Sequence, residues 1–184
     1  MSETTIINGQ PQGLSNKIVT YDGLVDFFKM LKDEIPKMGT DNIIAETAEY
    51  SYTFGRLNKS FAPYGFAIGN GNECRGIMTH AFGEGNHING VSTTAIGQEN
   101  HIGLKSSCWG AYVFGNNNSC DNIEYTYIFG NNNTCTNKDN SGVRILNAYG
   151  FGHNLTLTSN SVWLGNYNNP KSNVVFGIGN GTEG

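Results

Sequence analysis

A short apolar motif that ends in glycine recurs along most of the chain. Between residues 55 and 180 there are nine units in which an apolar residue and a glycine are followed, after two variable residues, by asparagine in all units but one. Successive glycines are separated by 14, 14, 14, 18, 15, 22, 13 and 12 residues. A unit of this length is too short for a pair of helices, so we expect short strands and turns.

The glycine and the asparagine of each unit are assigned to a turn. The glycines are Gly55, Gly69, Gly83, Gly97, Gly115, Gly130, Gly152, Gly165 and Gly177. The asparagines are Asn58, Asn72, Asn86, Asn100, Asn118, Asn133, Asn168 and Asn180, and Leu155 takes this place in the seventh unit. Glycine allows the backbone to turn a corner, and the asparagine is expected either to adopt a left-handed conformation or to lie inside the turn. Inside the turn, its side chain can hydrogen-bond to the turn backbone and to its copies in neighbouring units.

The residues before the glycine are expected to form a strand, whose side chains alternate between two faces. The residue one before the glycine is apolar in every unit, and the residue three before it, on the same face, is mostly aromatic or β-branched. The residue between them, on the opposite face, is either small, as at Ala67, or large and apolar, as at Trp163. Because both faces are mostly apolar, we expect this strand to be buried on both sides.

A second, shorter strand is expected after the asparagine. The fourth residue after the glycine is mostly polar, as at Lys59 and His87, whereas the fifth is apolar or small, as at Cys74 and Ile88. This alternation is typical of a strand with one face in water. Two short strands and two turns in about 14 residues predict one coil of a mainly β fold, a parallel β-solenoid or β-roll of about nine coils.

The longer spacings predict two insertions in the β-roll, near residues 101–112 and 136–147, and surface loops of this kind often carry binding functions. We assign the β-roll fibre domain to residues 42–184. In addition, Met38, Gly39 and Asn42, followed by Ile43 and Ile44, resemble a degenerate first coil.

Residues 1–41 have a different character and are assigned to an N-terminal attachment or oligomerisation segment. A 3,4-spaced apolar stripe predicts an amphipathic helix over about residues 21–35, which Thr20 or Asp22 can cap and Pro36 ends. The stripe consists of Leu24, Phe27, Phe28, Leu31 and Ile35. A lone helix of this length is marginal in water, so the stripe is expected to pack on the base of the roll, on its symmetry copies or on another protein.

Composition and charge exclude several classes of protein. The net charge is -4, and the basic residues beyond residue 50 are scattered among an equal number of acidic ones, so nucleic acid is not an expected partner. Residues 1–16 lack the basic and apolar regions of a secretion signal. No apolar run approaches the length needed to cross a membrane, so no membrane insertion is expected.

The cysteines fall mostly in one column of the repeat. Cys74, Cys120 and Cys135 all lie five residues after the glycine, in the place that Ile88 and other apolar residues fill elsewhere. Reduced, buried thiols that act as small hydrophobes are therefore expected. Cys120 and Cys135 would be neighbours in adjoining coils, and the sequence leaves their oxidation state open.

The remaining titratable residues favour neither a metal site nor catalysis. His87 and His101 lie four residues after the glycine, where solvated side chains are expected, although copies in a symmetric oligomer would be an alternative source of metal ligands. The acidic residues form no pair that the repeat would bring to the separation of about 5–9 Å typical of glycosidases. No catalytic residue, metal or cofactor is therefore expected.

Two aromatic residues are candidate ligand contacts. Trp109 and Tyr125 lie outside the packing columns, whereas Tyr112 and Tyr127 occupy the position three before the glycine. An exposed aromatic ring on a rigid scaffold can stack against a sugar. Trp109 and Tyr125 are therefore the residues expected to contact a glycan.

Residues 66–72 (FAIGNGN) and 94–100 (TAIGQEN) resemble the head repeats of trimeric autotransporter adhesins and similar repeats in bacteriophage fibre proteins. The resemblance covers roughly residues 52–180. It implies a left-handed parallel β-roll and a homotrimer around a threefold axis, which would explain why both faces of the first strand are apolar.

Since the signal peptide, coiled-coil stalk and membrane barrel of an autotransporter are not evident, we expect a structural virion protein of a bacteriophage. It would be a trimeric head or tail fibre without enzymatic activity, made in the host cytoplasm and displayed on the virion surface. The N-terminal segment would attach it to a capsid or tail protein, and the roll would decorate the particle or adhere to a host-surface glycan. The alternatives are a carbohydrate-binding or carbohydrate-degrading tailspike-like protein and a bacterial adhesin head fragment.

Overall fold

The computed structural model describes residues 25–26, 37–103, 108–135, 144–168 and 175–181. The chain divides into two compact units, Met1–Pro36 and Lys37–Gly184. In the first unit Val25 and Asp26 are helical, and the other residues of the expected amphipathic helix, with its apolar stripe, lie outside the described residues. The account below concerns the second unit.

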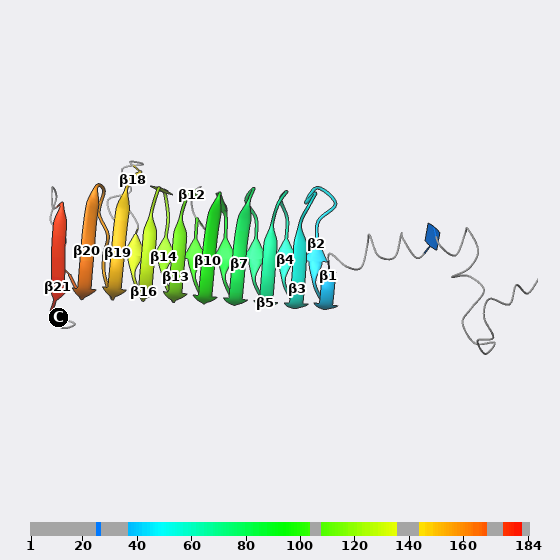
Figure 1. Ribbon diagram of the computed structural model, residues 1–184, viewed down its shortest axis with the longest axis horizontal. Coiled ribbons are helices and arrows are strands. Elements are labelled where there is room, and N and C mark those ends of the chain that lie inside the picture. The colour runs from blue at the N-terminus through cyan, green and yellow to red at the C-terminus, as the bar shows by residue number, and fades with distance from the viewer. Residues whose placement is uncertain (1–24, 27–36, 104–107, 136–143, 169–174, 182–184) are drawn as a thin grey trace, which may run out of the picture. The chain divides into compact units, whose positions relative to one another are not determined.

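The second unit is a parallel β-solenoid of about nine coils, with coils spaced by about 14 residues, as the sequence predicts (Figure 1). Its first wall, the long sheet, has ten strands in chain order. These are β1 (Lys37–Thr40), β3 (Tyr52–Arg56), β5 (Phe66–Asn70), β7 (Thr79–Glu84), β10 (Thr93–Gln98), β13 (Tyr112–Asn116), β16 (Tyr127–Asn131), β19 (Ala148–His153), β20 (Ser161–Asn166) and β21 (Phe176–Asn180). Strand β1 pairs with β3 and places Gly39 opposite Gly55, so the degenerate first coil is part of the solenoid.

The second wall, the short sheet, contains the predicted shorter strands. They are β2 (Ile43–Ile44), β4 (Lys59–Ser60), β6 (Glu73–Cys74), β8 (His87–Ile88), β11 (His101–Ile102), β14 (Ser119–Cys120) and β17 (Thr134–Cys135). In each of these strands from β4 to β17 the second residue is buried, whereas the first is partly exposed, except in β6, where Glu73 is buried as well. The expectation of a strand with one inward and one outward face is therefore confirmed.

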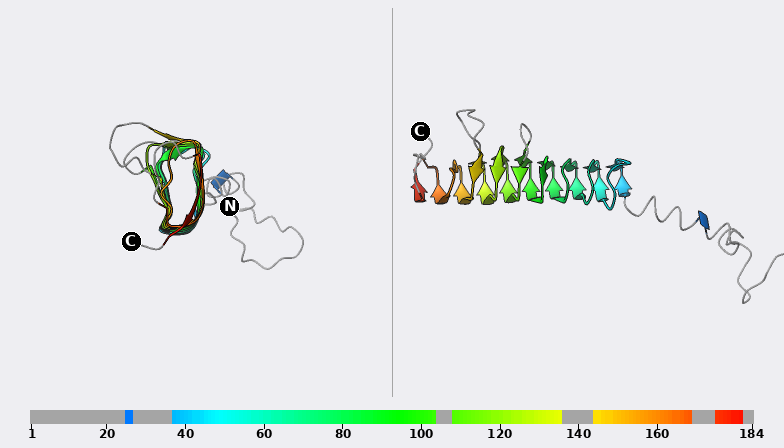
Figure 2. Two further views of the ribbon diagram at one scale, coloured as in Figure 1. Left: turned by 90° about the vertical axis from the view of Figure 1, so that its left-hand side faces the viewer. Right: turned by 90° about the horizontal axis from the view of Figure 1, so that it is seen from above.

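The middle coils have a third wall that the sequence analysis missed. The third sheet contains β9 (Gly90–Val91), β12 (Cys108–Trp109), β15 (Ile123–Glu124) and β18 (Ile145–Leu146). Strands β11 and β12 thus lie within the first expected insertion and β18 lies at the end of the second, and residues 104–107 and 136–143 lie outside the described part. The end-on view in Figure 2 shows the walls closing around a narrow interior.

The interior is filled by residues of matching size. The small inward residues Ala81 and Ala95 of the long sheet share coils with the large Ile88 and Ile102 of the short sheet. Larger inward residues, Val113 and Ile128, share coils with the smaller Cys120 and Cys135. Gly150 shares its coil with Leu157, and a Cβ at residue 150 would approach the Leu157 methyl groups to 2.7 and 2.9 Å. This complementarity keeps the packing dense from coil to coil.

The corner asparagines lie inside the solenoid and form a ladder. The side-chain oxygen of Asn86 accepts hydrogen bonds from the backbone N and from Nδ2 of Asn100, at 3.2 and 2.8 Å, and Nδ2 of Asn100 also donates to the Gly115 carbonyl at 2.6 Å. The same pattern, in which each Asn donates to the Asn before it and to the glycine carbonyl of the next coil, links Asn72, Asn86, Asn100, Asn118 and Asn133, all of which are fully buried. The alternative in which each asparagine lies inside the turn is thus the correct one for these units. The ladder ends where the side-chain oxygen of Asn133 accepts a hydrogen bond from the backbone N of Leu155, because the leucine side chain has no carboxamide to continue the ladder.

The register of the last unit differs from the sequence prediction. Gly179, not Gly177, lies opposite Gly165, so Gly177 is not a repeat glycine, and Asn180 is an exposed partner of Asn166 rather than a corner asparagine. The reason is Trp163, whose buried indole ring lies opposite Gly177, where a Cβ would come closer than 3.0 Å to the ring. Asn168 also lies outside the ladder and instead pairs with the Thr156 backbone.

We predict that Gly97→Ala strongly destabilises the solenoid, whereas Gly71→Ala is mild. Both glycines have a positive φ, which costs an alanine about 1–2 kcal/mol. A Cβ at residue 97 would in addition collide with the Gly115 carbonyl, whereas a Cβ at residue 71 meets no atom within 4 Å. Denaturant unfolding should give a loss of about 1 kcal/mol for Gly71→Ala and of more than about 3 kcal/mol for Gly97→Ala. Equal losses would show that close approach of coils is not what requires the glycine.

Candidate functional site

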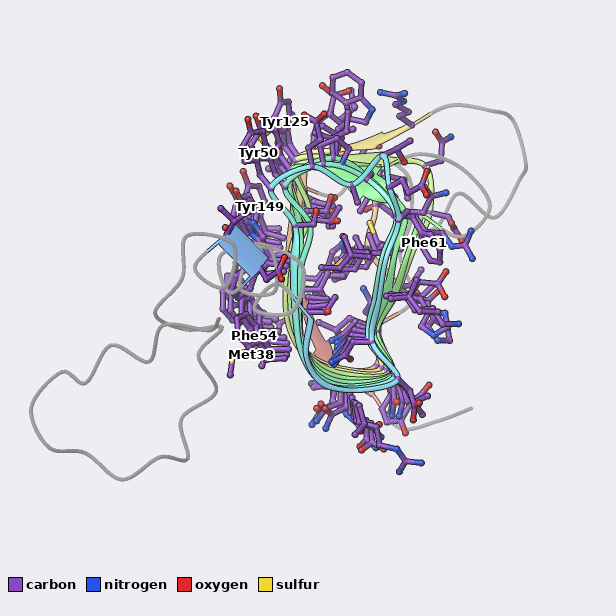
Figure 3. All side chains as sticks on the ribbon, turned by 90° about the vertical axis from the view of Figure 1, so that its right-hand side faces the viewer. Met38, Tyr50, Phe54, Phe61, Tyr125 and Tyr149 are labelled. Atoms are coloured by element: carbon purple, nitrogen blue, oxygen red, sulfur yellow. The ribbon has the colours of Figure 1, made fainter. Side chains whose placement is uncertain are left out.

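The outward side chains of the long sheet form two apolar columns, which we call the aromatic face. The residues one before each corner glycine are Met38, Phe54, Ile68, Phe82, Ile96, Phe114, Phe129, Phe151, Leu164 and Ile178. The residues three before it are Tyr52, Phe66, His80, Thr94, Tyr112, Tyr127, Tyr149, Val162 and Phe176. Figure 3 shows Met38, Phe54 and Tyr149 projecting from this wall, away from the interior.

The parallel, in-register pairing stacks the aromatic rings along the solenoid. The rings of Tyr112 and Tyr127 are 5.1 Å apart and nearly parallel, and those of Tyr127 and Tyr149 are 5.4 Å apart. Phe129 stacks in the same way between Phe114 and Phe151, at 4.8 and 5.3 Å. Ring separations of this size are favourable, so the rings stabilise one another along the stack.

Much of the aromatic face is exposed in the part of the chain that the structure describes. Phe129 and Phe151 remain 42% and 43% exposed, and at the two ends Met38 is 53% and Ile178 is 66% exposed. The expectation that the first strand is buried on both sides is therefore wrong for the single chain, because each coil is a closed loop and only one side of each wall faces its packed interior. Neither column contains an Asp, Glu, Lys or Arg. A continuous exposed apolar surface of this kind is typical of an interaction site.

The structure brings the two candidate ligand contacts together on the third sheet. Trp109 on β12 and Tyr125, directly after β15, are 47% and 55% exposed, and the Tyr125 backbone N donates to the Trp109 carbonyl at 3.0 Å. Tyr125 has a left-handed backbone (φ 53°), as does Gly110 (φ 61°). A Cβ at residue 110 would lie 3.1 Å from the Tyr125 ring, so the ring lies against Gly110, next to Trp109.

Sequence reasoning missed the charged residues beside these rings. The Arg144 guanidinium carbon is 5.8 Å from the centre of the Trp109 ring, and Nη1 of Arg144 is 3.4 Å from Oε2 of Glu124. Glu124 lies opposite Trp109 in the pairing of β12 with β15. The sequence signal that could have found Glu124 is its place opposite Trp109 in neighbouring coils. That correspondence can be recognised only after β12 and β15 have been assigned to a third wall.

The cysteines are free thiols in the interior. Cys74, Cys120 and Cys135 project inward from the short sheet and Cys108 from the third sheet, and all four are buried. Burial raises the pKa of Cys74 and of Cys108 to about 11 and that of Cys135 to about 12, and it raises the pKa of Cys120 well above its usual range. Because a thiolate is the reactive form, these thiols are unsuited to nucleophilic chemistry.

Of the four histidines, His87 and His101 lie on the outer side of the short sheet. The rings of His87 and His101 are 5.4 Å apart, and Nε2 of His101 is 3.8 Å from Oε2 of Glu99. Among the described residues, no three His, Cys, Asp or Glu side chains are grouped so that they could hold a metal ion. In the same part of the chain, no helix is long and apolar enough to cross a membrane.

No protein-family model, curated protein or solved structure matched the chain. The likeness to adhesin and fibre repeats thus rests on the repeat residues and on the parallel β-solenoid that they form. Any functional argument must therefore come from the surfaces of this solenoid.

The buried thiols predict a loss of stability at alkaline pH. In the unfolded chain a thiol ionises near its ordinary pKa of 9.0, whereas in the folded protein it stays protonated to about pH 11 or higher. The stabilisation is therefore complete below pH 9 and is lost above it, by about 1.4 kcal/mol per pH unit for each thiol. Denaturant unfolding between pH 8 and about pH 11 should show this slope, and Cys135→Ala should reduce it. An identical slope in Cys135→Ala would contradict the assignment to the thiols.

Proposed function

We propose that this chain is a structural fibre protein of a bacteriophage virion, in which three copies pack their aromatic faces around a common axis. The observation that carries the proposal is the aromatic face itself, an uncharged apolar surface that runs along all ten strands of the long sheet. Covering it would remove much apolar surface from water, which is the main driving force for association. A fibre needs such a lateral interface along its whole length.

A second copy of the chain is the partner that fits this face best. The two columns are straight and repeat at the spacing of the coils, because every coil pairs in register with the next. Another copy presents the same spacing, so that its rings can pack against these rings at every level. Closed symmetry is the usual outcome for identical chains, and the resemblance to adhesin and fibre repeats favours a threefold axis.

The virion setting rests on the same resemblance. In this proposal the N-terminal segment before strand β1, residues 1–36, docks on a capsid or tail protein, and the β-roll projects from the virion surface. The protein is made in the host cytoplasm and decorates the head or the tail. It binds neither nucleic acid nor membrane, and adhesion to the host surface is its second role.

We propose a non-enzymatic role rather than a glycan-degrading one. Four carboxylates contact basic or amide side chains: Glu73 contacts Lys59 and Arg75, Glu84 contacts Asn70 and Gln98, Glu99 contacts His101, and Glu124 contacts Arg144. Glycosidases instead use two carboxyl groups across a substrate groove. Release of new reducing ends from a capsular polysaccharide by the purified protein would refute this part of the proposal.

Light scattering on the purified full chain tests the trimer. We expect a mass of about 60 kDa, three times the 20.0 kDa of one chain, and we expect Phe129→Glu to shift the mass toward one chain, because it places a charge in the middle of the interface. Ser119→Glu is the matched control, since it lies on the outer side of the short sheet, in the column where Glu73 occurs naturally. A folded wild-type monomer, or a Phe129→Glu variant that keeps the wild-type mass, would contradict the proposal.

Incorporation into phage particles tests the virion role. Particles purified from cells that produce the protein should contain it, and Leu31→Asp should abolish incorporation while the purified variant keeps its β-solenoid spectrum and its mass. Lys32→Ala, on the polar side of the same expected helix, serves as the control and should be incorporated normally. Absence of the wild-type protein from purified particles would refute the virion role, whatever its oligomeric state.

A further inference from the structure

The Trp109 cluster, defined as Trp109, Tyr125, Glu124 and Arg144, combines two exposed aromatic side chains with an arginine–glutamate pair. It lies on the third sheet and at the corner next to the long sheet, where Figure 3 labels Tyr125. Three consecutive coils contribute to it through β12, β15 and the residue before β18. The cluster therefore stands on paired strands, which fix its spacing.

The corner residue next to Trp109 is small. Five residues before the glycine, the first coils carry Tyr50, Tyr64 and Met78, whereas the coils before and after Gly110 carry Ser92 and Tyr125. Tyr50 and Tyr64 stack on each other at 5.3 Å, which covers part of each ring. At the coil of Trp109 this corner residue is Gly110, so the Tyr125 ring lies over a glycine instead of another ring. The Tyr125 ring thus covers Gly110 without a second ring stacked on it from that side, and Tyr125 and the adjacent Trp109 stay 55% and 47% exposed.

The charged pair supplies hydrogen-bonding groups to the same place. Arg144 has five N–H donors and Glu124 has carboxylate acceptors. The contact of 3.4 Å between Nη1 of Arg144 and Oε2 of Glu124 uses only part of these donors and acceptors. The guanidinium also lies near the Trp109 ring, which holds it beside the aromatic surface. Because the two charges are opposite, the cluster carries no net charge and favours an uncharged ligand.

From this geometry we infer that the Trp109 cluster is a binding site for a neutral hexose unit of a glycan. A pyranose ring has an apolar C–H face that packs on an aromatic ring and hydroxyl groups that bind carboxylate and guanidinium side chains, and the cluster offers both in adjoining positions. The inference gives the proposed adhesive role a chemical partner. Binding itself can be measured on the purified chain in any oligomeric state, so it does not depend on the trimer.

The test is binding of the purified full chain to an array of neutral oligosaccharides that contain glucose, galactose or mannose. We expect wild-type protein to bind at least one of them, and Trp109→Ala and Tyr125→Ala each to weaken that binding about tenfold or more, equivalent to loss of one good contact. Glu124→Gln should weaken it as well. Tyr64→Ala is the matched control, because it removes an exposed ring of the same corner column several coils away. Light scattering must give the same mass for all variants.

Fluorescence supplies a second readout. The chain has two tryptophans, and Trp163 is buried with its indole N–H bonded to Ser161 at 3.1 Å, so a bound sugar should change the emission of Trp109 alone. The oligosaccharide that binds on the array should shift wild-type emission and leave Trp109→Ala unchanged. The inference is overturned if no oligosaccharide binds, if Trp109→Ala binds as well as wild type, or if Tyr64→Ala loses binding equally. A change of mass in Trp109→Ala would overturn it in favour of a contact between copies of the chain.

Discussion

The structure depends on the close approach of successive coils at the glycine–asparagine corner. At each level the corner glycine has a carbonyl of the next coil where a side chain would be, as between Gly83 and Gly97, and the buried asparagine donates to that same carbonyl. Glycine is thus needed because it leaves room for this carbonyl, and asparagine is needed because its carboxamide hydrogen-bonds to the same carbonyl. The ladder satisfies buried polar groups that would otherwise be costly, and it forces every coil from Asn42 to Asn133 into one register.

A fixed register converts sequence positions into columns with separate physical roles. Inside, a small residue on one wall is matched by a large one on the other, as Ala81 and Ala95 of the long sheet are matched by Ile88 and Ile102 of the short sheet. Outside, one wall carries stacked phenylalanine and tyrosine rings, while the opposite wall carries polar residues such as His87 and Ser119. Each wall can therefore change its chemistry without disturbing the corner. In our proposals the aromatic wall makes the contacts between copies of the chain, and the third wall contacts a glycan.

The glycine spacing was enough to predict the solenoid, the phase of most coils and the residues that share a face. It was not enough to tell which apolar face lies inside, because alternation is symmetric between the two sides of a strand. Gly177 was misassigned because its role is to admit the Trp163 ring, a contact between coils that local sequence does not reveal. The third wall was missed for a similar reason, because two-residue strands such as Cys108–Trp109 are not followed by the repeat motif of glycine and asparagine. The ion pair of Glu124 and Arg144 was missed along with this wall.

Hydrogen exchange of the asparagine side-chain amides, followed by NMR on the native protein, tests the corner ladder most directly. The account predicts that the Nδ2 protons of Asn72, Asn86, Asn100 and Asn118 exchange only when the solenoid opens, far more slowly than those of the exposed Asn117 and Asn131. Exchange of the corner amides at the rate of the exposed ones would contradict it, because the ladder would then not be closed to water.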